Sequence, residues 1–151
     1  MTQVSPHSAK ATTDSSESKI TSSWPLRASL WFSQILLAAV YLPAGMMKLF
    51  SPVSSVASQI PWAAEVPEWF LRSIGFIDIA AALGILLPTL LRLYPRLAPT
   101  AAAGSVLLQI CAMIFHSYRG EWMVVPMNLC ILGLSWWVYI GRLKKAPVVS
   151  R

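Results

Sequence analysis

Charged side chains are scarce in this sequence, and that scarcity limits what kind of protein it encodes. Of the 151 residues, 12% are charged and 56% are hydrophobic, and the mean hydropathy is +0.58. A chain of this length cannot hide so much apolar surface inside a water-soluble domain. The composition therefore excludes an ordinary soluble domain and indicates a membrane protein.

The residues that usually hold cofactors are also few. There are two cysteines and no C-x-x-C pair, and the two histidines, His7 and His116, lie far apart in the chain. The sequence has no glycine-rich phosphate loop and no cluster of acidic residues. It therefore contains no evident haem, metal or nucleotide motif.

Long apolar runs are what the sequence does contain. Four segments, at about 28–50, 69–88, 97–116 and 122–141, are each long enough to cross a hydrocarbon core of about 30 Å as a helix. Backbone groups in lipid must be paired within the segment, so helices are the expected structure. Two of the connections are short, which favours antiparallel neighbours. We predict an all-α, polytopic membrane protein with four transmembrane helices in an antiparallel bundle.

Both ends of the chain lie outside this predicted domain. Residues 1–26 are rich in Ser and Thr and are expected to form a disordered cytoplasmic tail. Residues 27–142 form the predicted transmembrane domain, and residues 143–151 form a basic cytoplasmic tail. The first apolar run is longer than that of a usual signal peptide and lacks a small-residue cleavage site, so we expect it to be retained.

Lys and Arg are distributed unequally between the two predicted sides. Nine of them share one side, whereas the loops of the other side hold Arg119 alone. Such asymmetry places both termini in the cytoplasm of a multi-pass integral protein. The net charge of +6 then reflects topology and attraction to anionic lipid, and requires no nucleic acid as a partner. The nine cations are Lys10, Lys19, Arg27, Arg92, Arg96, Arg142, Lys144, Lys145 and Arg151.

Aromatic residues are expected at both membrane interfaces. The inner group is Trp24, Trp31, Tyr94, Trp136, Trp137 and Tyr139, and the outer group is Trp62, Trp69, Tyr118 and Trp122.

Each predicted helix carries one stripe of small and polar residues at helical spacing. Stripes of this kind are expected to face inward, where helices approach closely and share hydrogen bonds. Near the outer side they predict a polar pocket for a ligand or a partner. Its candidate residues are Lys48, Arg72, Asp78, Gln109, His116 and Asn128.

Each candidate also has a structural interpretation. Asp78, the only acid within the spans, could bind a ligand or a proton, or could form an ion pair with Lys48 or Arg72. Arg72 is turned about 120° from Asp78, so it flanks the pocket or extends to the outer headgroups. His116 could relay protons or anchor the helix end.

The remaining polar and sulfur-bearing residues are expected to be structural. Gln109 and Asn128 are expected to cross-link helices. Cys111 and Cys130 each stand two residues from one of them, about 200° around the helix, so a redox-active pair in the pocket is not expected.

Several segments resemble one membrane protein family. The segments "GMMKL", "RSIGFIDIAAALGILLP", "AAAGSVLLQICAMIFHSYRGE" and "VPMNLCILGL" are similar to the DoxX-like integral membrane proteins. The most specific element is R-x-x-G-x-x-[ED] followed by G-x-x-x-P, and here the acidic position is Asp78, where the family more often has glutamate. Lys48, His116 and Asn128 match other recurrent polar positions of the family. The resemblance implies a four-helix bundle.

The resemblance also implies functions of two classes. Some relatives are subunits of membrane oxidoreductases that pass electrons from sulfur compounds or thiols to quinone, or are partners of thiol- or superoxide-handling proteins. Animal relatives assist the assembly of other membrane proteins. We therefore expect a small accessory subunit of a quinone- or thiol-linked redox system in a bacterial plasma membrane, which works with a membrane protein partner and is not catalytic alone. The expectation of quinone as a cofactor follows from the resemblance only. The alternative functions are a non-enzymatic assembly scaffold and a pathway for small molecules or protons.

Overall fold

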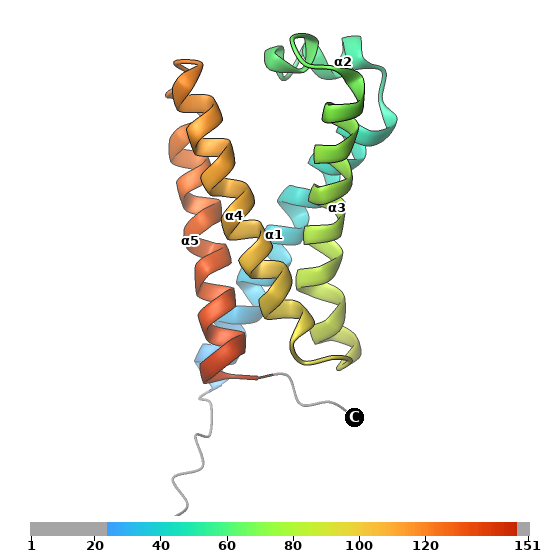
Figure 1. The fold of residues 1–151 in the computed structure, drawn as a ribbon. Helices are drawn as coiled ribbons and strands as arrows, with labels where there is room; N and C mark the ends of the chain where they lie inside the picture. The colour runs from blue at the N-terminus through green and yellow to red at the C-terminus, as the bar shows by residue number, and fades with distance from the viewer. Residues whose placement is uncertain (1–23, 148–151) are drawn as a thin grey trace, which may run out of the picture.

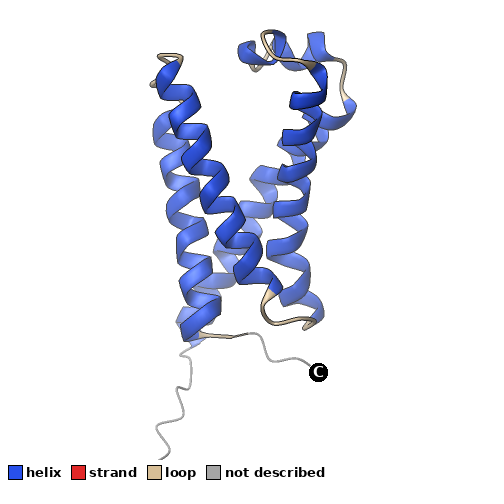
Figure 2. Cartoon of the chain, viewed as in Figure 1, coloured by secondary structure: helices blue, strands red, loops and turns tan. Residues whose placement is uncertain are grey.

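The protein is built from helices throughout the part of the chain that the structure describes. The computed structural model describes residues 24–147, which contain no strand (Figure 2). The predictions for residues 1–23 and 148–151 fall outside this range. The long helices are α1 (Trp24–Phe50), α3 (Glu68–Leu91), α4 (Leu97–Tyr118) and α5 (Val125–Ile140). The short ones are α2 (Val53–Ala57), the 3₁₀ helix η1 (Pro61–Ala64) and the π-helical turn η2 (Gly141–Lys145).

Three of these helices are long and apolar enough to cross a membrane. They are α1, α3 and α4, with 27, 24 and 22 residues. α5 has 16 residues, but the chain continues into η2 without a break. The prediction of an all-α membrane protein is therefore confirmed.

The ends of three helices differ from the predicted spans, and each difference lies near a proline. α1 begins at Trp24, because Pro25 is compatible with a first helical turn and so does not delay the helix. α3 continues past Pro88 and ends at Leu91, and the next residue, Arg92, caps it with a left-handed backbone whose φ is 55°. α5 begins at Val125 instead of residue 122, since Pro126 fits only the first turn.

The long helices form two pairs that diverge toward one end (Figure 1). α1 lies beside α3, α4 lies beside α5, and the pairs approach each other at the end where α3 turns into α4. We call this the terminal end, because residues 24 and 147 lie there, and the end with α2 and η1 the distal end. α1 and α3 are closest at two glycines: a Cβ atom on Gly45 would lie 2.7 Å from the carbonyl oxygen of Gly75.

The stripes of small and polar residues face inward, as predicted. The core between the helices is made of the buried residues Leu37, Ala38, Tyr41, Ala81, Ala82, Ile85, Ala102, Ile131 and Val138. A second, smaller core forms at the distal end from Val56, Trp62, Ala63 and Leu71. Trp62, which we predicted near the outer interface, is 7% exposed and packs edge-on against Phe115, with ring centroids 5.6 Å apart.

Candidate functional site

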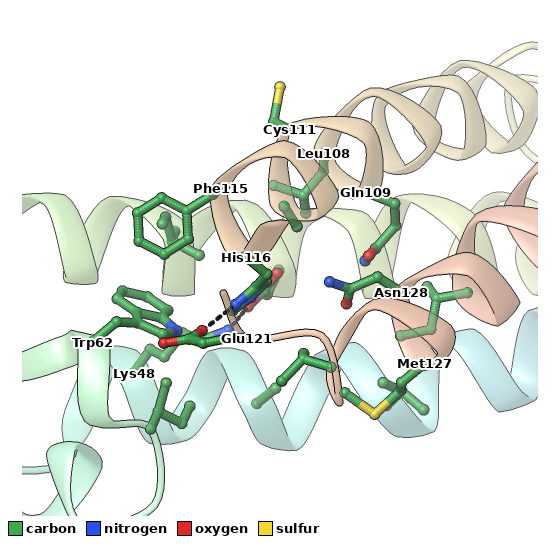
Figure 3. Close-up of a pocket in the computed structure, with 18 of the residues that line it drawn as sticks. Lys48, Trp62, Leu108, Gln109, Cys111, Phe115, His116, Glu121, Met127 and Asn128 are labelled. Carbon is green, nitrogen blue, oxygen red and sulfur yellow. Dashed lines mark hydrogen bonds and ion pairs between the residues drawn. The ribbon is translucent and has the colours of Figure 1, made fainter. Parts of the chain in front are cut away.

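A cavity of about 870 Å³ lies between the two helix pairs toward the distal end (Figure 3). Its walls are mainly apolar and come from all four long helices and from the connection that contains η1. Five of the six predicted pocket residues line it: Lys48, Asp78, Gln109, His116 and Asn128. Its size is within the range of about 300–1,000 Å³ that is typical of small-molecule sites.

Lys48 and Asp78 form an ion pair on the wall made by α1 and α3. Nζ of Lys48 lies 2.6 Å from Oδ2 of Asp78, and the two side chains are 12% and 5% exposed. The approach of the helices at Gly45 and Gly75 brings these side chains together, since Gly75 is one turn before Asp78 and Gly45 is one turn before Lys48. The pair neutralises both charges and leaves Asp78 without a second partner in the described chain.

Arg72 is the one predicted pocket residue that does not line the cavity. Its Nη1 donates hydrogen bonds to the backbone carbonyls of Lys48 and Ser51, at 2.7 and 2.8 Å. Its Nε and Nη2 bind the exposed carboxylate of Glu68. Arg72 thus supplies donors to carbonyls that the end of α1 leaves without helical partners.

His116 stands at the distal mouth of the cavity in a chain of charged groups. Its Nδ1 lies 2.5 Å from Oε2 of Glu121, and Nε of Arg119 lies 2.8 Å from the other oxygen of Glu121. Arg119 also makes a two-pronged contact with Glu65, at 2.5 and 2.9 Å. This series of charged contacts joins the loop after η1 to the end of α4.

This network lowers the pKa values of its two carboxyl groups. The hydrogen bond from His116, followed by that from Arg119, holds the pKa of Glu121 below its usual value, and Arg119 does the same for Glu65. An ionised carboxylate only accepts hydrogen bonds, so Nδ1 of His116 must carry the hydrogen that lies between it and Glu121. Nε2 has no protein partner among residues 24–147 and is the nitrogen that a ligand could reach.

A row of hydroxyl groups runs from the inner part of the cavity into the core. The hydroxyl oxygen of Tyr41 lies 2.6 Å from Oγ of Ser105. Oγ of Ser105 lies 2.7 Å from Oγ of Ser135. Oγ of Ser135 donates a hydrogen bond of 2.8 Å to the carbonyl oxygen of Ile131. These three contacts use all three hydroxyl hydrogens, one for each contact. Tyr41 therefore has no hydrogen left for Gln109, and the 2.8 Å contact between them requires Nε2 of Gln109 as the donor.

This counting fixes the orientation of the Gln109 amide. With Nε2 held by Tyr41, the carbonyl oxygen Oε1 of Gln109 is buried and has no hydrogen-bond partner within residues 24–147. On α5, Nδ2 of Asn128 is also buried and has no partner in the same range. The two residues are each 5% exposed, and Figure 3 shows their amide ends turned toward the same part of the cavity. Gln109 thus cross-links α4 to α1 as expected, whereas the expected cross-link from the Asn128 side chain is not present.

The two cysteines, Cys111 and Cys130, are free, and both are exposed. Cys111 is one of the residues that line the cavity, but its sulfur points away from the labelled polar residues (Figure 3). No three His, Cys, Asp or Glu side chains between residues 24 and 147 gather into a group that could hold a metal ion.

A separate polar cluster secures the terminal end. Nε and Nη2 of Arg142 donate to Oε1 of Gln34, at 2.9 and 2.5 Å, and Nε2 of Gln34 donates to Thr89 and to the carbonyl of Ile85. Arg142 is 5% exposed, and its guanidinium lies 5.7 Å from the ring centroid of Trp31. Arg142, which we predicted as one of the cytoplasmic-side cations, thus also makes buried contacts that join η2 to α1 and, through Gln34, to α3.

Several residues of the site were not predicted from the sequence. Tyr41, Ser105 and Ser135 belong to the predicted stripes, and their hydroxyl groups were the signal that they could be linked. Glu121 stands at the start of the predicted stripe of the last span, although it was not named as a pocket residue. Trp62 was predicted only as an outer aromatic residue, and no local pattern indicates that it lines the cavity.

Comparison with known proteins agrees with the resemblance seen in the sequence motifs. No curated protein matched the chain, and no solved structure matched it. The model of the DoxX-like family matches residues 32–138, a range that contains the cavity residues Lys48, Asp78, Gln109, His116 and Asn128. Because this match covers most of the chain, the protein is an integral membrane protein that belongs to the DoxX-like family.

Proposed function

We propose that this protein is a small accessory subunit of a membrane redox system and that its cavity holds a lipid-soluble carrier of the quinone class. The observation that carries the proposal is the cavity itself, which combines apolar walls with a few polar groups at membrane depth. Family membership supports the redox context, since some DoxX-like proteins serve quinone-linked enzymes.

The residues present fit such a carrier. A quinone head offers carbonyl oxygens, and Nδ2 of Asn128 is a buried donor without a partner. The ring and its substituents would lie among Val40, Leu108, Phe115 and Ile131. When bound, a quinone would accept two electrons and two protons, while this chain would orient the head and exclude water. Electron donation is assigned to a partner protein, because the described residues supply neither a cysteine pair nor a metal cluster.

The proposal includes a four-span topology with both termini in the cytoplasm. α5 continues into η2 without a break, and α5 lies beside α4 (Figure 1). Arg27, Arg92 and Arg96 belong to the terminal end, as do the cations of η2, whereas Arg119 lies at the distal end. The cavity then opens toward the outer side of a plasma membrane.

The carrier can be tested on the purified protein. Protein isolated in mild detergent should retain a quinone that solvent extraction and mass spectrometry identify. Ala112→Trp should greatly reduce this retention, because Ala112 lines the cavity and the added indole would occupy it. Ile114→Trp is the matched control, since Ile114 lies on the same helix and is 65% exposed. Equal retention by both variants would contradict binding in the cavity.

The partner can be tested separately. Affinity isolation from membranes, followed by mass spectrometry, should recover dehydrogenases or thiol-handling enzymes. Recovery of unrelated membrane proteins at an early stage of their assembly would instead favour the scaffold function.

A further inference from the structure

The two unpaired amide groups of the cavity differ in chemical character, and one of them is fixed. Oε1 of Gln109 can only accept a hydrogen bond, and the hydroxyl row through Tyr41, Ser105 and Ser135 prevents the amide from turning over. Asn128 has no hydrogen bond to its side chain, so its Nδ2 is free to donate. A ligand that satisfies both groups must donate to Gln109 and accept from Asn128.

One hydroxyl group does both. It has one hydrogen to donate and lone pairs to accept, whereas a carbonyl or an ether oxygen only accepts. A head group without a hydrogen would leave Oε1 of Gln109 buried and unpaired, which costs more than the loss of an exposed hydrogen bond. We therefore propose that the cavity selects a lipid-soluble molecule by a hydroxyl head placed between Gln109 and Asn128.

This inference rests on the proposed function and specifies which ligand the cavity prefers. For a quinone-class carrier, the reduced form, which bears hydroxyl groups, binds more tightly than the oxidised form. The walls require that the rest of the molecule be apolar. The neighbouring charges of Lys48 and Asp78 already neutralise each other, so the head group itself need not be charged.

The experiment uses the full chain in lipid nanodiscs and measures the ligand-induced shift of the thermal unfolding midpoint. Two probe pairs are compared after correction for partitioning into lipid: a short-chain naphthohydroquinone with its naphthoquinone, and a 4-alkylphenol with its methyl ether. The second pair cannot change its redox state, so it isolates the hydroxyl hydrogen. In each pair we expect the hydroxyl compound to bind about 5- to 10-fold more tightly, as one additional hydrogen bond would give.

Variants assign the preference to the two amides. Gln109→Leu should abolish the preference for the hydroxyl compound, and Asn128→Leu should weaken both members of a pair. Leu129→Ala, which changes a residue of α5 that is 57% exposed, should leave the preference unchanged. Should Gln109→Leu fail to fold, the comparison of the probe pairs on the parent protein still decides the question.

The outcomes separate the inference from the proposed function. Equal binding of the phenol and its ether would refute selection by a hydroxyl group while leaving a carrier in the cavity. Absence of binding by all four probes would refute both, and would indicate that water alone bridges the two amides.

Discussion

At the scale of single residues, the fold tolerates polar groups where a neighbouring helix supplies a partner. Gln34, Tyr41 and Ser105 have hydrogen-bond partners on other helices. Gln109 and Asn128 each keep an unpaired buried atom, and both line the cavity. Since unpaired polar groups are costly in an apolar interior, this pair is the strongest indication of a ligand in the molecule.

The pair of Lys48 and Asp78 gives a prediction about stability. Asp78→Asn should lower the unfolding midpoint in detergent and the abundance in membranes, because it leaves the Lys48 charge without its partner. Breaking a buried pair costs about 3–5 kcal/mol in soluble proteins, and we expect less here because Lys48 stands near the distal end and can turn toward water. The double variant Asp78→Asn with Lys48→Met should recover most of the loss.

One control variant accompanies this prediction. Glu68→Gln removes an exposed carboxylate that also pairs with a cation, and it should have little effect. If the double variant is as unstable as Asp78→Asn alone, the carboxylate has a role besides neutralising Lys48.

At the scale of the elements, glycines set the distance between α1 and α3. Gly45→Ala would place a Cβ atom 2.7 Å from the carbonyl oxygen of Gly75 and 2.8 Å from Cγ1 of Ile79. The helices must separate to accept it, and overpacking of this kind costs about 1–3 kcal/mol. The variant should unfold at a lower temperature and should also weaken the contact between Lys48 and Asp78. Gly133→Ala is the control, because in the described chain no atom outside its own stretch of helix lies within 4 Å of the added methyl group, and it should be neutral or stabilising.

The distal connection gives a prediction about pH. The pKa values of Glu65 and Glu121 lie below the usual 4.5 in the folded protein, because each accepts hydrogen bonds from charged neighbours. Their contribution to stability is complete above pH 4.5 and is lost as the pH falls through the lowered pKa values. The unfolding midpoint should therefore decrease below pH 4.5. Arg119→Gln should lower the midpoint at neutral pH and reduce its pH dependence; an unchanged pH dependence would show that other groups control it.

At the scale of the whole molecule, the proposed topology makes a prediction about sidedness. A reporter fused after Arg151 should be cytoplasmic, and a cysteine introduced at Ser54 should react with an impermeant thiol reagent from outside the cell, because the cations gather at the terminal end. A Cys111→Ala, Cys130→Ala background removes labelling of the native cysteines. Labelling of residues at both ends from outside would contradict the topology.

The sequence by itself determined the membrane class, the helical fold and the inward face of each helix. Side chains at helical spacing share one face whatever the helix packs against, so Gln34, Asp78 and Ser105 could be assigned to the interior from their spacing alone. The family and five residues of the cavity wall follow from the same stripes and their motifs.

Only the tertiary structure decided which groups meet. Spacing fixes a direction around one helix, but it does not fix the height or rotation of the neighbouring helix. It could therefore not decide that Lys48 pairs with Asp78 while Arg72 binds carbonyls at the end of α1. Spacing also could not show that every hydrogen of the hydroxyl row is used and that Oε1 of Gln109 is left unpaired in the described chain. Both depend on distances between atoms of three different helices.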